Sequence, residues 1–352
     1  MIHGGDVYTD GLLKNRNLLD FSSNVNPLGV PNLFKDNINE ALINVEKYPD
    51  IKYRELLSNL SNYVGVKDKH IVLGNGAAEI IDLAISCFKS ILIVVPSFAE
   101  YEISANKWGC HIEYSYLTEN MDFDYDDIKQ KIHNQEALII ANPNNPNGRT
   151  IDKGKFKEIL EICEKEQKFI LIDEAFIEFT GDKSRSFVAE TLSYKCIIII
   201  RALTKFFGMP GIRFGYGISI NEYILEKIRE KQNPWNINSF AELAVKYALN
   251  DILYIEKSLI WIEQEREVFT SGLKNISFIK KVFSTRANFI LCKLNNLTSE
   301  KLYDLCLEEG ILIRKADNFK GLDNSFIRLA IKDSCSNEKL IEVFKKIEVL
   351  VR

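Results

Sequence analysis

Four consecutive isoleucines, Ile197 to Ile200, constrain the fold more than any other stretch of this 352-residue chain. A run of β-branched apolar side chains is too apolar for a surface and is typical of a strand that is buried on both faces. Such strands belong to parallel sheets that carry helices on each side. The polar residues after the run therefore begin where a buried strand ends, and Lys205 and Arg213 follow closely there.

Further apolar runs recur along the chain, with helix-like segments between them. They lie at residues 91–95, 138–141 and 169–173, and shorter candidate strands precede the turn GNGAAE and span CHIEYSYL. Continuous apolar runs that alternate with helices predict an α/β fold. Its sheet is expected to be mostly parallel and covered by helices on both faces.

The chain is expected to divide into three regions. Residues 1–35, which include HGGD and LLDFSSNVNPLGVP, form a turn-rich arm of the kind that wraps a partner subunit or the rim of a site. Residues 36–245 form a large domain. A long helical stretch over about residues 240–272 then leads the chain into a smaller α+β domain, residues 246–352.

Composition excludes several classes of partner. The formal net charge of -4 leaves no electrostatic footprint for nucleic acid and no basic face for anionic lipid. No apolar run approaches the roughly 20 residues that span a bilayer, and the N-terminus MIHGGDVYTD lacks the apolar stretch of a signal peptide, so we expect a cytoplasmic protein. The histidines show no HxxxH spacing and the cysteines no CxxC pair, so we expect no metal site.

Groups capable of chemistry follow the predicted strands. Ligands of open α/β sheets bind in the crevice outside the carboxyl ends of the strands, so these groups are expected to meet there. GNGAAE is a turn of small residues that opens a helix, whose free N–H groups and positive dipole end suit a phosphate. The groups are Gly76 and Ala77 in that turn, Asn144 and Asn145 in NPNNPNG, Asp173 after FILI, and Thr204, Lys205 and Arg213 after the isoleucine run.

Taken together, these groups describe an aromatic cofactor that bears a phosphate, an aldehyde and a basic ring nitrogen. Asp173 would keep the ring nitrogen protonated, because a nearby carboxylate favours the charged form. Lys205 would form an imine with the aldehyde, which requires a neutral amine and hence a pKa lowered by burial or by neighbouring cations. Arg213, Thr204 and the amides of the GNGAAE turn would hold the phosphate.

Each of these features also has a purely structural explanation. GNGAAE lacks the third glycine of the dinucleotide-binding fingerprint GxGxxG, Asn-Pro pairs are commonly turns, and Asp173 is of a residue type favoured as a helix cap. A structural α/β scaffold that binds nothing therefore remains an alternative. So does a non-catalytic protein that only carries the cofactor.

Three longer motifs carry a resemblance that runs essentially from end to end. NPNNPNG is similar to PNNPTG, DEAFIEF to DEAYxEF, and LTKFFGMPGIRFGY to the lysine-arginine signature of the class I/II aminotransferase superfamily. The chain thus resembles fold-type I enzymes that depend on pyridoxal 5'-phosphate. The resemblance implies a large cofactor-binding domain with a mostly parallel sheet, a smaller C-terminal α+β domain, and a homodimer with shared active sites.

Two branches of that superfamily compete. Histidinol-phosphate aminotransferases share most of these motifs, and such an aminotransferase is the alternative function. The threonine-phosphate decarboxylase branch is more similar, because it also matches HGGD, LDFSSNVNPLG, YPD, PSFAEY, NPW, ILIRKADNFKGLD and FIRLAIK. This branch implies decarboxylation of L-threonine O-3-phosphate to (R)-1-amino-2-propanol O-2-phosphate in cobalamin biosynthesis. The motifs do not determine which bond at Cα breaks.

Further site residues are implied by the resemblance alone. Asn145 matches the residue that hydrogen-bonds the ring oxygen of the cofactor, and Phe98 matches the aromatic side chain that stacks on its ring. Tyr48 matches a tyrosine that reaches the cofactor phosphate of the other subunit. The residues implied to bind the phosphorylated amino acid are Arg328 for its α-carboxylate, Arg314 for its phosphate, and His3 and Asn24 for closing the site.

The sequence departs from the aminotransferase pattern at two positions. Phe176 stands where these enzymes usually carry a tyrosine whose phenol contacts the ring oxygen of the cofactor, which leaves Asn145 as the main partner there. A phenylalanine at this position is similar to the decarboxylase branch. Ala202 occupies a position where a hydroxyl residue often assists the phosphate, so the hold on the phosphate is expected to depend on Thr204 and Arg213.

Overall fold

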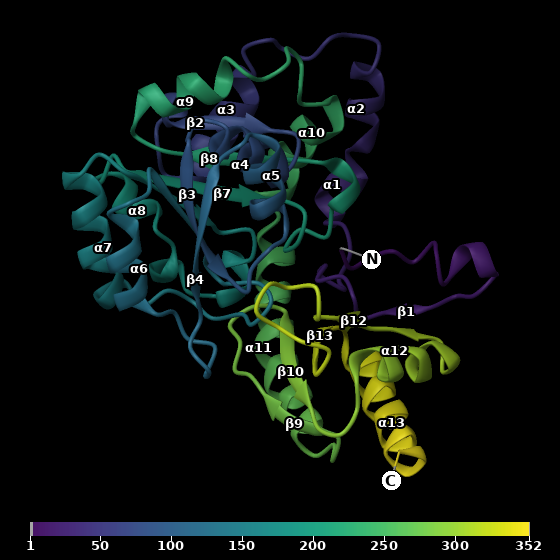
Figure 1. Cartoon of the computed structure of the whole chain (residues 1–352). Coiled ribbons are helices and arrows are strands. Elements are labelled where there is room, and N and C mark those ends of the chain that lie inside the picture. Colours follow the sequence, from purple (N-terminus) through teal and green to yellow (C-terminus); the bar gives the residue numbers. More distant parts are fainter. Residues whose placement is uncertain (1–2, 352) are drawn as a thin grey trace.

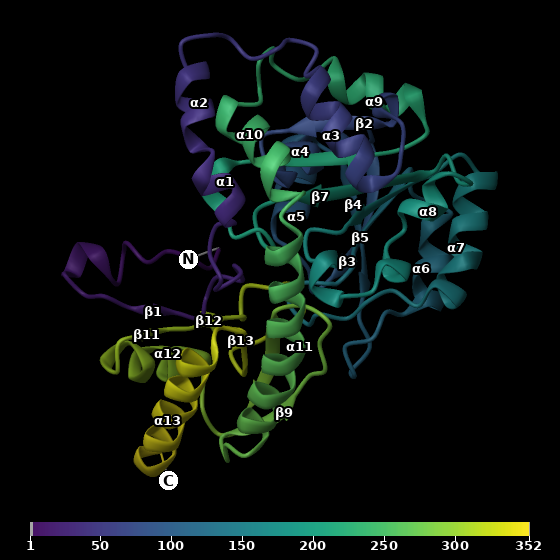
Figure 2. The same ribbon diagram turned by 180° about the vertical axis from the view of Figure 1, so that it is seen from behind.

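The computed structural model describes residues 3–351 as two packed regions joined by a long helix (Figure 1). One region holds a seven-stranded sheet with helices around it, and the other holds a four-stranded sheet. Helix α11 (Ile252–Lys274) runs from one region to the other, as the view from behind shows (Figure 2). The arrangement confirms the predicted α/β class, with a mostly parallel large sheet and a smaller C-terminal region.

In the large sheet, neighbouring side chains along a strand pack in two different hydrophobic cores, one on each face of the sheet. Its strands are β2 (Ile71–Gly74), β3 (Ser90–Val95), β4 (His111–Tyr116), β5 (Ala137–Ala141), β6 (Phe169–Asp173), β7 (Ile197–Ala202) and β8 (Gly215–Ile218). They run in the order β2-β8-β7-β6-β5-β3-β4, in which β8 lies antiparallel to both neighbours. Ile197 and Ile199 pack in one core cluster, whereas Ile198 and Ile200 pack in another. The isoleucine run is therefore buried from two sides, as predicted.

Helices occupy both faces of this sheet. On the face of Ile198, α4 (Ala77–Ile85), α5 (Glu100–Lys107) and α9 (Glu222–Arg229) contribute buried side chains. On the opposite face, α6 (Tyr125–Ile132) and α7 (Lys153–Lys165) do the same. Five further helices belong to this region: α1 (Asn32–Asp36), α2 (Ile38–Asn44), α3 (Arg54–Val64), α8 (Val188–Thr191) and α10 (Ser239–Ala248).

The predicted helical stretch over residues 240–272 is helical but interrupted, because the chain forms two helices there. α10 ends at Ala248 and α11 begins at Ile252. Asp251 caps α11, since its side chain accepts a hydrogen bond from the backbone N–H of Tyr254. Aspartate competes for backbone hydrogen bonds in helix interiors and favours N-caps, so the break has a local cause.

Beyond α11 the chain forms a small antiparallel sheet. Its strands are β9 (Ile279–Val282), β10 (Phe289–Leu294), β12 (Arg314–Lys315) and β13 (Phe326–Ala330), in the order β12-β13-β10-β9. Helices α12 (Ser299–Glu308) and α13 (Ser334–Leu350) belong to the same region. The register of β12 and β13 places Arg314 directly opposite Arg328. Two residues predicted to bind the substrate are therefore neighbours across one strand pair.

The N-terminal arm is tied to both regions. Its strand β1 (Leu19–Asp20) pairs in parallel with β11 (Ile311–Leu312). Asn26 donates its backbone N–H to the carbonyl of Lys205 (3.0 Å) and its side-chain amide to the carbonyl of Phe206 (2.8 Å). The arm thus holds the loop that carries Lys205. Residues 1 and 2 of the predicted arm and residue 352 lie outside the described residues, and the boundaries at residues 35 and 245 remain predictions.

Within residues 3–351, no helix combines the length and the apolar character that a membrane crossing requires. α11 has 23 residues, but charged side chains occur along its whole length. In the same part of the chain, no group of three or more His, Cys, Asp or Glu side chains is placed to hold a metal ion.

Candidate active site

A cavity of about 320 Å³ opens at the carboxyl ends of β5, β6 and β7. Its walls come from the arm, the start of α4, the ends of these strands and the small sheet. The volume lies in the range of small-molecule sites. Of the predicted site residues, the cavity brings together His3, Asn24, Ala77, Phe98, Asn145, Asp173, Thr204, Lys205, Arg213, Arg314 and Arg328.

Lys205 lies in the wall of this cavity, just beyond the end of β7 at Ala202. Burial, helped by the nearby guanidiniums of Arg328 and Arg213, lowers its pKa from 10.5 to about 8. At neutral pH about a tenth of the amine is then uncharged, which is several hundred times more than for an ordinary lysine. Lys205 therefore has the lowered pKa that the sequence analysis required of a nucleophile.

Asp173 ends β6 and is only 8% exposed. Its carboxylate accepts hydrogen bonds from the hydroxyl of Tyr101 (2.6 Å) and the backbone N–H of Ala175 (2.9 Å). Burial raises the pKa of Asp173, and these two donors oppose the rise. A cationic nitrogen beside this poorly solvated carboxylate would be held strongly. The sequence analysis missed Tyr101, because it reaches Asp173 from α5 through tertiary packing.

The turn before α4 forms a cradle for an anion. Gly76 has a φ of +85°, and a Cβ there would lie 2.5 Å from Nη2 of Arg213. Glycine is therefore required at this position for its backbone conformation and for the approach of the guanidinium. A Cβ at Gly215, on β8, would likewise clash with the backbone of Ala77. Within residues 3–351 no side chain caps the start of α4, so the backbone N–H groups of Ala77 and Ala78 are left for a ligand.

Arg328 enters the cavity from β13 and is 5% exposed. Its Nη1 donates to Oδ1 of Asn145 (2.6 Å), and its Nη2 donates to the carbonyl of Ser22 (2.8 Å). Its Nε has no hydrogen-bond partner in the described part of the chain. Because Arg328 occupies the amide oxygen of Asn145, the amide nitrogen is the group that Asn145 can offer to a ligand.

Arg314 faces the same cavity from β12 and is 4% exposed. Its Nη1 donates to the carbonyl of Lys315 (2.7 Å), and its Nη2 donates to Oδ1 of Asn318 (2.7 Å). Burial lowers the pKa of both arginines, that of Arg328 to about 9 with a further contribution from Arg314. Two buried guanidiniums on neighbouring strands make this side of the cavity suitable for anions.

The arm closes another side of the cavity. Asn24 is buried, and its Oδ1 lacks a hydrogen-bond partner among residues 3–351. Nε2 of His3 lies 2.8 Å from Oε1 of Glu100, and the His3 ring lies 5.6 Å from the ring of Phe98. A buried oxygen without a partner costs stability unless a ligand or water meets it. The position of Asn24 is therefore compatible with its predicted role.

Both departures from the aminotransferase pattern lie in the cavity wall. Phe176 packs edge-on against Phe289, at 5.0 Å between ring centres, and Nζ of Lys205 lies 6.0 Å from its ring. Its side chain offers no hydroxyl to a ligand. Ala202 also lines the cavity, and Thr204 follows it there with a hydroxyl of its own.

Tyr48 lies outside the cavity. It is 80% exposed, and its ring packs against that of Trp235 at 4.7 Å. Within one copy of the chain it does not meet the other predicted site residues. Its role toward a second subunit remains a prediction.

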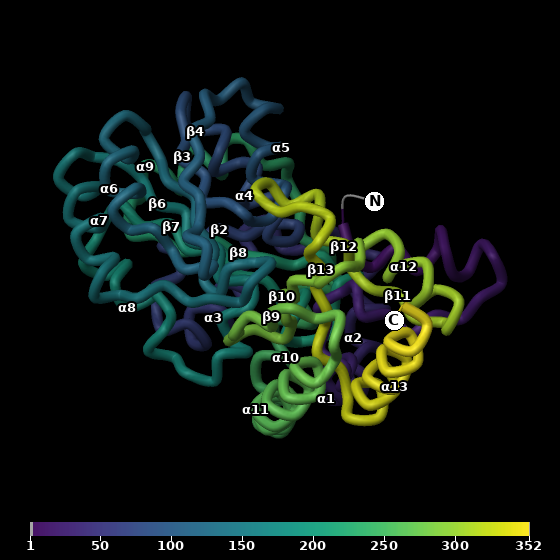
Figure 3. Tube along the Cα trace, turned by 60° about the horizontal axis from the view of Figure 1, so that its bottom comes forward, coloured from purple at the N-terminus to yellow at the C-terminus, as the bar shows by residue number. Residues whose placement is uncertain are grey.

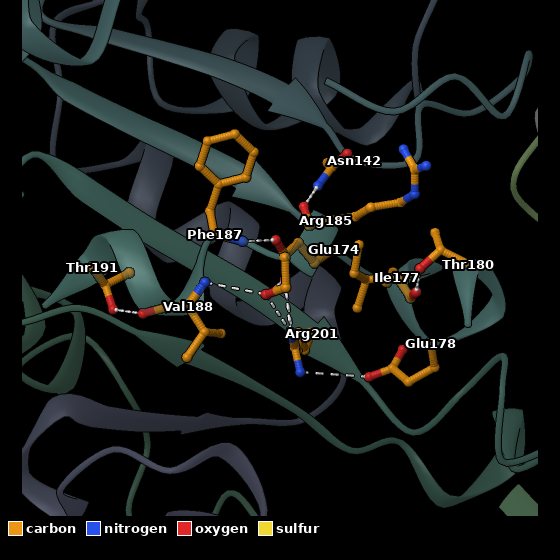
Figure 4. A network of polar contacts seen from close by, with 12 residues as sticks. Asn142, Glu174, Ile177, Glu178, Thr180, Arg185, Phe187, Val188, Thr191 and Arg201 are labelled. Atoms are coloured by element: carbon orange, nitrogen blue, oxygen red, sulfur yellow. Dashed lines mark hydrogen bonds and ion pairs between the residues drawn. The ribbon is translucent and has the colours of Figure 1, made fainter. Parts of the chain in front are cut away.

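Behind β6 and β7 lies a second group of charges, which the sequence analysis did not identify (Figure 4). Glu174 is fully buried and accepts hydrogen bonds from the hydroxyl of Ser186 (2.8 Å), the N–H of Phe187 (2.7 Å) and Nη2 of Arg201 (2.9 Å). Successive residues of an extended chain point to opposite faces, so Glu174 points away from the cavity that Asp173 lines. This group therefore belongs to the framework of the sheet.

The chain is similar to known proteins over most of its length. Residues 16–347 match the family described as Aminotransferase class I and II. A protein of Caldanaerobacter subterraneus subsp. tengcongensis, provisionally named threonine-phosphate decarboxylase, is 40% identical over 97% of this chain and 93% of its own length. The threonine-phosphate decarboxylase of Salmonella typhimurium is 30% identical over 98% of this chain and 96% of its own length.

One solved structure that is similar to this chain is described by a different activity from that of these relatives. It is described as the histidinol-phosphate aminotransferase from Clostridium acetobutylicum, shares 56% identity and superposes with a TM-score of 0.93. The match covers 95% of this chain and 100% of that one. Similar proteins therefore bear the names of both activities that the motifs left open.

Proposed function

The chain belongs to the aminotransferase class I and II family, and from this premise we propose that it decarboxylates L-threonine O-3-phosphate. It has the fold-type I architecture and the dependence on pyridoxal 5'-phosphate of that family. The observation that carries the proposal is the pair of buried arginines, Arg314 and Arg328, that face the cavity of Lys205. The identities of 40% and 30% to relatives named for this reaction support it.

The residues of the cavity fit the cofactor. A Cβ at Gly76 would fill the cradle beside Arg213, so this space is kept for an anion such as the cofactor phosphate. Asp173 offers a buried carboxylate to the ring nitrogen, Asn145 has its amide nitrogen left for the ring oxygen, and Lys205 has a lowered pKa. When bound, the cofactor supplies an electron sink for the bond that breaks at Cα.

Each of the two arginines binds one anionic group of the substrate. Arg328 binds the α-carboxylate and Arg314 binds the phosphate, each through the planar fork of its guanidinium. The arm residues His3 and Asn24 border the same cavity and close it over the substrate. A substrate with two anionic ends can place one end on each of the two buried guanidiniums.

Lys205 moves the proton of the reaction. Its pKa of about 8 lets the amine take up a proton from solvent and, once charged, deliver it to Cα after carbon dioxide leaves. With the cofactor bound, the residues that hold the substrate would decide whether the bond from Cα to the carboxylate or the Cα–H bond breaks. Because Arg328 holds the carboxylate, a displacement of about 1 Å at this residue changes which bond breaks.

Release of carbon dioxide tests the proposal. The holoenzyme is incubated with L-threonine O-3-phosphate and no keto acid, and carbon dioxide and aminopropanol phosphate are measured together. We expect both products in equal amounts at a steady rate. No carbon dioxide here, together with transfer of the amino group in a parallel incubation that contains 2-oxoglutarate, would reject decarboxylation.

A second candidate is histidinol-phosphate aminotransferase. The 56% identity to the Clostridium acetobutylicum structure of that description favours it. This activity would use the same arginines for glutamate and for the phosphate of histidinol phosphate. Turnover of histidinol phosphate with 2-oxoglutarate, measured beside threonine phosphate under the same conditions, separates the two candidates.

We also propose that the active enzyme is a homodimer in which Tyr48 reaches the cofactor phosphate of a second copy. Tyr48 is 80% exposed, and Leu42, Ile43 and Val45 just before it are 55%, 69% and 57% exposed. Exposed apolar side chains gathered in one short stretch are typical of a protein interface. The cradle at Gly76 would then be completed by the second copy.

Mixing two inactive variants tests this arrangement. Tyr48→Ala and Lys205→Ala are purified separately, then dissociated and reassociated together. A mixed dimer contains one site with both native residues, so activity should reappear on mixing. A monomer by light scattering at assay concentration, or no recovered activity, would contradict the shared site.

A further inference from the structure

The loop between β12 and β13, residues 316–325, extends from the small sheet to the large region (Figure 3). Phe319 in this loop is 6% exposed and lines the cavity. The guanidinium carbon of Arg314 lies 5.3 Å from the centre of its ring, and that of Arg328 lies 5.9 Å away. One aromatic ring therefore contacts both arginines of the candidate substrate site.

These arginines would repel each other without such a ring. Arg314 and Arg328 are direct partners in the register of β12 and β13, where opposite side chains share a face and like charges destabilise. Both side chains are nearly fully buried, so solvent screens the repulsion poorly. The face of an aromatic ring attracts cations. Phe319 thus offers the face of one ring to both guanidiniums.

The residues on either side of Phe319 fix the loop at two points. Oδ1 of Asn318 accepts a hydrogen bond from Nη2 of Arg314 (2.7 Å). Nζ of Lys320 lies 3.1 Å from Oε1 of Glu102 on α5 and 4.1 Å from the ring centre of Tyr114 on β4. Lys320 therefore attaches a loop of the small region to the large one, next to the residue whose ring contacts both arginines.

We propose that Phe319 determines the spacing between the two anion-binding positions of the cavity, and that Lys320 positions Phe319 through Glu102 and Tyr114. The site then selects amino acids whose carboxylate and phosphate are separated as in threonine phosphate, and rejects longer homologues. The identity of the substrate rests on the proposed function. The spacing is a property of Phe319 whichever bond breaks.

The preference for chain length tests the proposal. L-serine O-phosphate and L-homoserine O-phosphate carry the same two anionic groups and differ by one methylene between them. Calorimetric titration of the holoenzyme gives their relative affinity without a need for turnover. We expect the native enzyme to bind serine phosphate at least about tenfold more tightly, the lower end of what one methylene changes in a fitted site.

Three variants distinguish the role of Phe319 in the spacing from the role of Lys320 in positioning Phe319. Phe319→Leu removes the ring and should reduce this preference to about threefold or less, while raising KM for threonine phosphate more than it lowers kcat. Lys320→Met should shift the preference in the same direction by a smaller factor. Lys315→Met is the matched control: its Nζ lies 5.1 Å from the ring of Tyr303, outside the residues that line the cavity, and its preference should stay native.

An unchanged preference in both Phe319→Leu and Lys320→Met would overturn the inference, as would a native enzyme that binds the two ligands equally. Should Phe319→Leu fail to fold, Lys320→Met decides by the same ratio, because that side chain is 36% exposed. If the chain does not decarboxylate threonine phosphate, the outcome differs from that of a wrong inference about Phe319. Carbon dioxide is then absent with threonine phosphate although the length preference is present.

Discussion

Asp173 and Glu174 are neighbours in the chain, yet they lie on opposite faces of the large sheet and differ in what surrounds them. Glu174 accepts hydrogen bonds from Ser186, Phe187 and Arg201 in a framework that uses both of its oxygens (Figure 4). Its ion pair with Arg201 spans 2.9 Å. A buried carboxylate that is paired in this way holds the sheet together.

Asp173 faces a cavity in which polar groups are left without protein partners. Its own carboxylate accepts from Tyr101 and from one backbone N–H, while Oδ1 of Asn24 and Nε of Arg328 have no partner among residues 3–351. Buried polar atoms are nearly always satisfied in folded proteins. Both oxygens of Glu174 therefore have protein partners, whereas two polar atoms in the cavity wall are left for a ligand.

The largest expected effect comes from the cavity side. Lys205→Ala should lower turnover by about 10²–10⁴-fold, the contribution of a positioned acid or base, and abolish the visible absorbance of the bound cofactor. The midpoint of thermal unfolding of the cofactor-free protein should not fall, because the variant removes a poorly solvated amine. After borohydride reduction and peptide mapping, a cofactor label on any other lysine would contradict this role.

Substitutions in the buried cluster of Glu174 and Arg201 should instead lower the stability of the fold. Glu174→Ala removes the closer carboxylate partner of buried Arg201 and leaves only Glu178, at 3.8 Å, so it should lower the free energy of unfolding by about 3–5 kcal/mol. Urea unfolding measures the change. The double variant Glu174→Ala/Arg201→Met should recover part of that loss, since the buried guanidinium is then also removed. A loss below about 1 kcal/mol in the single variant would show that the pair contributes little.

The framework also contains a group that should make stability depend on pH. Glu178 lies 3.8 Å from Nη1 of Arg201, and burial raises its pKa to about 7 although Arg201 opposes the rise. Between about pH 4.5 and 7 the folded state then binds more protons than the unfolded state. The free energy of unfolding should therefore fall as pH rises through this window.

Replacing the carboxyl group of Glu178 tests whether it makes the free energy of unfolding fall as pH rises. Glu178→Gln should remove that pH dependence and be more stable than the native chain above pH 7, by about 1–3 kcal/mol. Glu256→Gln on α11 changes an exposed glutamate and serves as the control. A Glu178→Gln variant that loses stability at pH 8 would show that the ionised carboxylate stabilises the fold through Arg201.

The smallest effect is expected at the edge of the cavity. Tyr101→Phe removes one of the donors to Asp173, which should weaken cofactor binding about tenfold, the usual effect of one hydrogen bond to a charged group. The dissociation constant of the cofactor, followed by its absorbance, is the measurement. Tyr116→Phe alters a tyrosine that is 49% exposed and should have no effect. Equal affinities in all three proteins would place Asp173 outside the cofactor site.

The local pattern of the sequence was sufficient for much of the fold. Burial on two faces is encoded in the run Ile197 to Ile200 itself, and the break between α10 and α11 is encoded by Asp251, although the break was missed. The groups that follow strand ends were also predictable, because parallel strands bring their carboxyl ends to one edge. Domain boundaries and the role of Tyr48 stay predictions.

The sequence by itself determined that Asp173, Lys205 and Arg213 would follow buried strands, because periodic apolar runs place strand ends without knowledge of the rest of the chain. Only the tertiary structure decided that Tyr101 meets Asp173 and that the ring of Phe319 contacts two arginines. These contacts join elements far apart in the chain. They depend on how helices and sheets pack, which no local pattern of residues encodes.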